Sequence, residues 1–181
     1  MRRRTLDYLL SWVGVLLTVA LLGAGALLMV GYSFDTSSVT TQLRDQNFSF
    51  PAKTALVLPA QNAVIPFAGQ QVLTGPEAQV FANDVLAVHL KAIGGGKTYS
   101  EVSAASLADP TNTALANQAD LLFKGTTLQG SLLTAYAFWT FGVIALWSSI
   151  ACFILGALML MLTLMGFRHY TKVDPHAVIA A

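Results

Sequence analysis

The sequence predicts an all-α membrane protein, in which two transmembrane helices enclose a small, mainly helical extracytoplasmic domain with extended loop segments. The first observation is composition: 55% of the 181 residues are hydrophobic and 10% are charged, whereas about a quarter are charged in ordinary soluble domains. The second is that the hydrophobicity is concentrated in two long uncharged runs, residues 8–32 and 125–167. The third is that the region between these runs contains both helix-start signals and prolines.

Residues 8–32 are predicted to form the first transmembrane helix, after a cytoplasmic segment over residues 1–7. At about 1.5 Å of rise per residue, this run exceeds the ~20 residues that cross the hydrocarbon core. A cleaved signal peptide is the alternative, because basic residues precede the run and Ala24-Gly25-Ala26 resembles a cleavage site. Signal peptides have apolar segments of about 7–15 residues. The run here continues past that site to Val30, which favours an uncleaved helix.

Residues 33–139 are predicted to lie outside the cytoplasm. Their first part is polar, and Asp35, Thr36 and Ser37 can cap a short helix that extends the first span. Prolines then recur at positions 51, 59 and 66. Because proline interrupts both helices and ladders, residues 48–74 are predicted to be an extended loop.

The clearest helix of this region is predicted from Thr74 to Ile93. Thr74 is a capping residue, and a first-turn proline and a first-turn acid follow it. The apolar stripe of this helix comprises Phe81, Val85, Val88 and Ala92. Three glycines, residues 94–96, are expected to end the helix, with a turn around Tyr99 after them.

A further helix is expected after Asp109-Pro110, with Thr111 or Asn112 as its cap. It leads through residues 128–136, where apolar and polar side chains alternate at helical spacing. The second transmembrane helix is placed at residues 140–167, as the membrane end of this longer helix. A short tail, residues 168–181, follows.

The basic residues predict the orientation of both spans. Lys and Arg are retained on the cytoplasmic side of a membrane. They flank the outer ends of the two runs, at Arg2, Arg3, Arg4, Arg168 and Lys172. Both termini are therefore expected in the cytoplasm.

Small residues predict a helix-packing face on each span, because they let helix backbones approach closely. The second span carries Ala145, Ser148, Ser149, Cys152 and Gly156, and the first carries Ala20 and Ala24. The two spans packing on each other is the first interpretation. Docking of this face onto another membrane protein is the second.

Residues 94–98 invite comparison with a phosphate-binding loop, since Gly-Lys-Thr ends both patterns. However, Lys91 stands where the first glycine of that motif belongs, and the loop closes a helix instead of opening one. A helix stop is the favoured interpretation. His89 is placed on or beside the apolar face of its helix, and a hydrogen-bonded structural role is favoured over a metal ligand.

The chemistry expected from the sequence is sparse. No catalytic residue, cofactor or metal site is predicted, and the possible ligand or partner surface comprises His89, Gly95, Gly96, Lys97 and Tyr99. A net charge of +1 argues against nucleic acid as a partner, because neutralising phosphates requires a basic surplus. Cys152 is the single cysteine and excludes an intrachain disulfide.

Several short segments resemble those of uncharacterised two-transmembrane-helix membrane proteins of actinobacteria. They include Phe67-Ala68-Gly69-Gln70, Ala82-Asn83-Asp84, His89-Leu90-Lys91, Gly95-Gly96-Lys97-Thr98-Tyr99-Ser100-Glu101 and Leu122-Phe123-Lys124-Gly125. The resemblance covers most of the chain in the same order. It implies a bacterial plasma membrane and brings no established activity, cofactor or catalytic residue.

The sequence therefore predicts a non-enzymatic accessory or scaffold protein. Its extracytoplasmic domain and transmembrane face would dock onto a larger envelope complex, with the lipid bilayer and a membrane protein or a second copy as partners. An extracytoplasmic ligand-binding sensor is the alternative, and an envelope enzyme is third.

Overall fold

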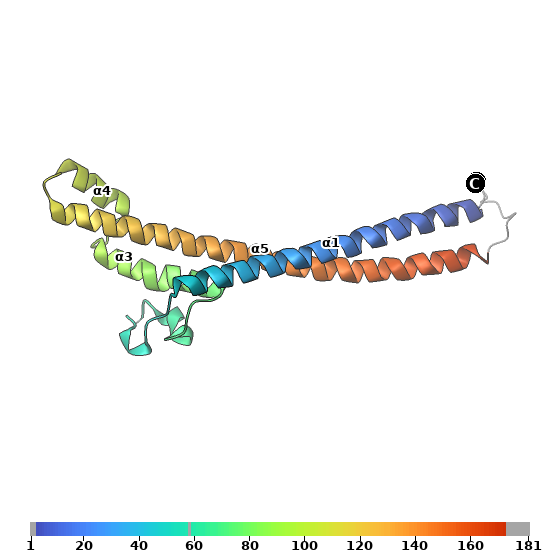
Figure 1. The fold of residues 1–181 in the computed structure, drawn as a ribbon, viewed down its shortest axis with the longest axis horizontal. Helices are drawn as coiled ribbons and strands as arrows, with labels where there is room; N and C mark the ends of the chain where they lie inside the picture. The colour runs from blue at the N-terminus through green and yellow to red at the C-terminus, as the bar shows by residue number, and fades with distance from the viewer. Residues whose placement is uncertain (1–2, 58, 173–181) are drawn as a thin grey trace. The chain divides into compact units, whose positions relative to one another are not determined.

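The computed structural model describes residues 3–57 and 59–172, and this part of the chain is helical and without a β-sheet. A single antiparallel bridge joins Ser49 and Gln71. Two long helices dominate the fold (Figure 1), and shorter elements connect them. In chain order the elements are α1 (Arg3–Gln46), η1 (Lys53–Ala55), η2 (Asn62–Phe67), α2 (Gly75–Val80), η3 (Phe81–Leu86), α3 (Ala87–Ile93), α4 (Tyr99–Ala108) and α5 (Thr113–Tyr170). The all-α prediction is confirmed for the described residues.

The chain forms two compact units. Unit 1 comprises Met1–Ser33 and Gly142–Ala181, and unit 2 comprises Phe34–Phe141. Helices α1 and α5 contribute residues to both units.

Helices α1 and α5 are each long and apolar enough to cross a membrane. In their most apolar windows, 17% and 11% of the residues are buried inside the protein. A core helix of a soluble protein would bury most of such a window, whereas a span exposes it to lipid. The expected short helix after the first span is part of α1 itself, since no proline or glycine interrupts residues 33–46. The prediction that residues 140–167 form the end of a longer helix is confirmed by α5.

In unit 1, α1 and α5 pack through small and hydroxyl-bearing residues. On α5, the buried residues Ser149, Gly156 and Thr163 recur every seven positions. A seven-residue repeat keeps one face of a helix against its neighbour. The corresponding buried residues of α1 are Ser11, Gly14, Thr18 and Gly25.

A hydrogen bond joins the two helices of unit 1 at Gly25. The Ser149 hydroxyl is fully buried and donates to the Gly25 carbonyl at 2.8 Å. A methyl group on Gly25 would lie 3.1 Å from the Phe153 ring and 3.3 Å from Cβ of Cys152. A side chain at residue 25 would therefore press tightly on α5 beside the hydrogen bond between the helices.

Ala20 and Ala24, the predicted packing face of α1, are both exposed and so do not form its contact with α5. A strict four-residue spacing was assumed, but the contact alternates between three and four residues and so selects Gly25. On α5, Ser149 and Gly156 are buried, and Ala145, Ser148 and Cys152 are half-buried.

The main core of unit 2 joins both long helices to the connecting segment. Its buried members are Val39, Leu43, Phe50, Val64, Val72, Ala78, Ala82, Val85 and Leu132. The ring of Phe50 packs on Phe67 and Phe81 at centroid distances of 5.3 and 5.5 Å. Residues 48–74, predicted as an extended loop, contain the short helical turns η1 and η2 and contribute Val64 and Val72 to this core.

The predicted helix start at Thr74 is confirmed by a capping box. The Glu77 carboxylate accepts from the Thr74 N–H at 2.9 Å, and the Thr74 hydroxyl accepts from the Glu77 N–H. Both ends of this reciprocal pair satisfy donors that the first helical turn leaves free.

This helix contains a π-helical turn, η3, which the sequence analysis did not predict. The Ala82 carbonyl accepts from the Ala87 N–H, five residues on, and from Gln129 Nε2 of α5 at 3.2 Å. The wider turn shifts the apolar face by one residue, so that Leu90 is buried while His89 and Ala92 are exposed. The predicted stripe is therefore wrong at Ala92, and His89, predicted on or beside the apolar face, is exposed instead.

Helix α4 replaces the turn expected around Tyr99. Thr98 and Glu101 form a second capping box, in which the Glu101 carboxylate accepts from the Thr98 N–H at 2.7 Å. The Val102 side chain of α4 is buried with Leu90 and Leu122 in a second small core. The missed signal is the Thr-x-x-Glu spacing, which marks a helix start.

Candidate functional site

The glycine-rich turn between α3 and α4 is closed by its own hydrogen bonds. The N–H groups of Gly94, Gly95, Gly96 and Lys97 donate to the carbonyls of Leu90, Ala92, Lys91 and Gly94 at 2.9 to 3.1 Å. Gly95 and Gly96 have positive φ angles of 59° and 83°, which glycine adopts at little cost. A phosphate-binding loop presents free amides to its ligand. These four amides are engaged, so the arrangement is that of a helix stop.

The polar side chains around this turn do not converge on one point. His89 and Lys97 are exposed, and Tyr99 lies against Phe123 at a ring-centroid distance of 5.6 Å. Within residues 3–57 and 59–172, no group of three His, Cys, Asp or Glu side chains could hold a metal ion. The predicted surface at His89, Gly95, Gly96, Lys97 and Tyr99 is thus an exposed turn.

A wide hollow of about 560 Å³ lies between the end of α3 and the start of α5 in unit 2. Its lining residues are Ile93, Asn112, Ala114, Leu115, Asn117, Gln118 and Leu121. We call it the distal hollow. Leu121 is 53% exposed and Ile93 is 38% exposed, and Gln118 Nε2 donates to the Ile93 carbonyl at 2.6 Å. The hollow therefore combines exposed apolar side chains with a rim of uncharged amides.

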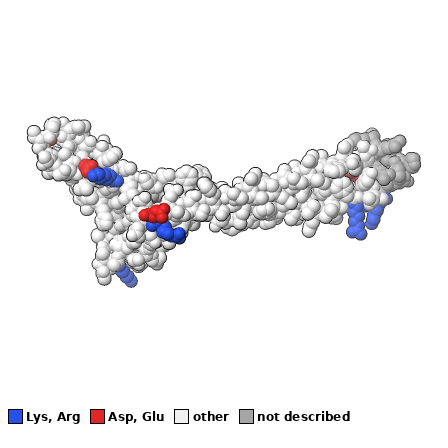
Figure 2. Space-filling view, in the orientation of Figure 1, with Lys and Arg blue, Asp and Glu red and all other residues white. Residues whose placement is uncertain are grey.

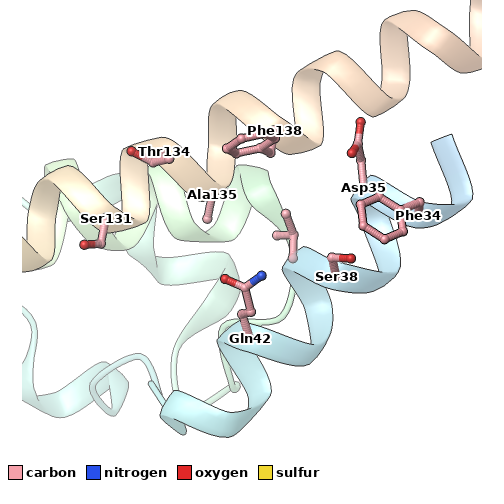
Figure 3. Close-up of a pocket in the computed structure, with 9 residues that line it drawn as sticks. Phe34, Asp35, Ser38, Gln42, Ser131, Thr134, Ala135 and Phe138 are labelled. Carbon is pink, nitrogen blue, oxygen red and sulfur yellow. The ribbon is translucent and has the colours of Figure 1, made fainter. Parts of the chain in front are cut away.

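A second, narrower concavity of about 400 Å³ lies between α1 and α5 in unit 2. It is lined by Phe34, Asp35, Ser38, Val39, Gln42, Ser131, Thr134, Ala135 and Phe138. We call it the α1–α5 groove. Figure 3 shows Asp35 and Gln42 extending from α1 toward α5, with Ser131 and Ala135 extending from α5 toward α1. Asp35 is the sole charged residue in this lining.

The residues that predicted the orientation lie at the ends of the long helices. Arg168 and Lys172 are exposed at the end of α5. Arg3 and Arg4 belong to the start of α1, and Arg2 lies outside the described residues, as does the tail beyond Lys172. On the face drawn in Figure 2, the middle of the two long helices carries no charged side chain.

No protein-family model, curated protein or solved structure matches this sequence. What the distal hollow and the α1–α5 groove can bind is therefore inferred from the residues that line them.

Sequence reasoning missed both concavities. The sequence pattern presents Asp35 as a possible helix cap and gives no separate role to Leu121. The groove joins residues about a hundred positions apart, and its partners could not be paired without knowing how α1 and α5 align. One signal was present: Asp35 is the first charge after the uncharged run of α1.

Proposed function

We propose that this chain is a non-enzymatic accessory protein of a bacterial plasma membrane, which docks its extracytoplasmic unit onto a larger envelope complex. In this proposal α1 and α5 cross the bilayer within unit 1, and unit 2 lies outside. Both termini lie in the cytoplasm, because Arg168 and Lys172 follow one span and the arginines at positions 2–4 precede the other.

The distal hollow is the observation that carries the docking proposal. Its exposed Leu121 and Ile93 lie in the extracytoplasmic unit, where water and not lipid would cover them. Exposed apolar side chains within a polar rim mark protein interaction sites. Asn112, Asn117 and Gln118 supply that rim without any charge, so the hollow suits an uncharged, apolar segment of a partner.

The test is native purification of the full chain in mild detergent, followed by mass spectrometry, for the wild type and two variants. Leu121→Asp places a charge in the hollow and is expected to release a stoichiometric membrane-protein companion. Leu107→Asp is the matched control, because Leu107 is 78% exposed on α4 and does not line the hollow. A wild type that purifies as a monomer without a companion would count against the proposal, as would equal loss in both variants.

A further inference from the structure

The α1–α5 groove presents hydrogen-bond acceptors whose own donors are already engaged. The Ser131 hydroxyl donates to the Thr127 carbonyl at 3.1 Å, and the Thr134 hydroxyl donates to the Gly130 carbonyl at 2.9 Å. Because each hydroxyl carries one proton, these two oxygens can only accept from a ligand. The α5 side of the groove therefore favours a molecule that donates.

Asp35 adds a negative charge to this acceptor set. The carboxylate is half-buried, and among the described residues no hydrogen bond or ion pair engages it. No Lys or Arg lines the groove. A carboxylate in this position is best satisfied by a cation that also donates hydrogen bonds. A primary ammonium offers three N–H donors and no acceptor.

The groove lies in sequence next to both predicted spans. Phe34 follows the first predicted span at residue 32, and Phe138 precedes the second at residue 140. These rings are 69% and 53% exposed. Residues within two positions of the end of a span lie near the depth of the lipid headgroups. A volume of about 400 Å³ is within the range of small-molecule sites.

We propose that the α1–α5 groove binds a phospholipid whose headgroup carries a primary ammonium, with Asp35 as its counter-ion. Thr134 and Ser131 offer further acceptors along the α5 side of the groove, and the Gln42 amide is available to donate to the headgroup phosphate. This site is separate from the distal hollow, so it can fail while the docking proposal stands.

The test compares two lipids that differ only at the amine. The full chain is incubated with phosphatidylethanolamine or phosphatidylcholine of identical acyl chains, and bound lipid is quantified by native mass spectrometry. The trimethylated amine of phosphatidylcholine has no N–H donor but keeps the charge and the phosphate. We expect the primary amine to bind about three- to tenfold more tightly, which is the range for the net contribution of one ordinary hydrogen bond.

Two variants and one control assign the preference to the groove. Asp35→Asn should remove most of the preference, and Thr134→Val, which keeps the side-chain shape, should reduce it. Asp120→Asn removes the same charge from an exposed position on α5 outside the groove and should leave the preference intact. Equal binding of the two lipids overturns the proposal. So does a preference that survives Asp35→Asn, or stronger binding of the anionic phosphatidylglycerol or of a glycolipid without an amine.

Discussion

Thr98 and Glu101 decide where α4 begins, and their contact is sensitive to pH. The N–H and the hydroxyl of Thr98 both donate to the Glu101 carboxylate, at 2.7 and 2.8 Å. The backbone bond and then the side-chain bond lower the pKa of Glu101 below its ordinary value of 4.5, and Lys97 adds a smaller effect. The charged form of Glu101 therefore stabilises the start of α4.

The sign of the pH dependence follows from that direction. Because the folded pKa lies below the unfolded value, the stabilisation is complete above pH 4.5 and is lost as the pH falls through the folded pKa. We expect amide hydrogen exchange across residues 99–108 to accelerate, relative to the intrinsic rate, as the pH is lowered below 4.5. In Glu101→Gln this acid-induced change should be absent. Exchange that accelerates equally in both proteins would contradict the assignment.

Residues 20, 24 and 89 show which predictions fail at the level of single side chains. Ala20 and Ala24 are small, but Gly25 forms the contact because the helix pair repeats every seven residues. His89 is exposed because η3 shifts the helix face by one position. In each case the residue type could be interpreted from the sequence. The direction in which the side chain points depends on contacts made elsewhere in the chain, and these contacts could not be predicted.

Among the elements, α2 is held against α5 by a glycine that has no room for a side chain. Gly75 is buried, and a methyl group there would overlap Cβ and Cγ of Trp139. Trp139 cannot move its Cβ without moving α5. Gly75 is also the first residue of α2, directly after the Thr74 cap. The atoms nearest to a methyl group on Gly75 therefore lie close to the α5 backbone, which holds them in place.

We expect Gly75→Ala to destabilise the protein by about 1–3 kcal/mol through overpacking. In a chain of this size, this lowers the thermal midpoint by several degrees, at about 2–4 °C per kcal/mol. The measurement is circular dichroism of the full chain in detergent.

Gly130→Ala is the matched control. Gly130 lies inside α5, and nothing is within 4 Å of a methyl group there. Replacing a helical glycine by alanine stabilises by about 0.5–1 kcal/mol, so this midpoint should stay the same or rise. Equal destabilisation by both substitutions would show that steric overlap with Trp139 is not the cause.

Local signals predicted the elements that have strong caps. Thr74 with Glu77, and Asn112, whose side chain accepts from the Leu115 N–H at 3.1 Å, begin helices as expected. Helix α4 was missed because a glycine-rich turn before it dominated the interpretation. The segment of residues 48–74 could not be assigned, since its short helical turns depend on burial of Val64 and Val72 against other elements. Periodicity and capping are local, whereas these contacts are not.

At the scale of the whole molecule, the proposed topology can be tested with a single cysteine. Cys152 is the chain's single cysteine and is half-buried, so Cys152→Ala provides an unreactive background. In that background, a membrane-impermeant maleimide should label Leu107→Cys in intact cells. It should label Lys172→Cys only after the membrane is permeabilised. The reverse pattern would place unit 2 in the cytoplasm and overturn the proposed orientation.

The π-helical turn at η3 lets this helix contain one extra residue while its buried face stays in register before and after the turn. Such a turn is equivalent to one extra residue in an α-helix. Regular α-helical winding of the same residues would turn His89 toward the place of Leu90, which packs with Val102 and Leu122, and would carry an imidazole into an apolar core. A deletion of one residue within Phe81–Leu86 removes the extra residue together with the π-turn and keeps the leucine on the buried face. Related sequences that share this fold but lack the π-turn should therefore be one residue shorter in this segment.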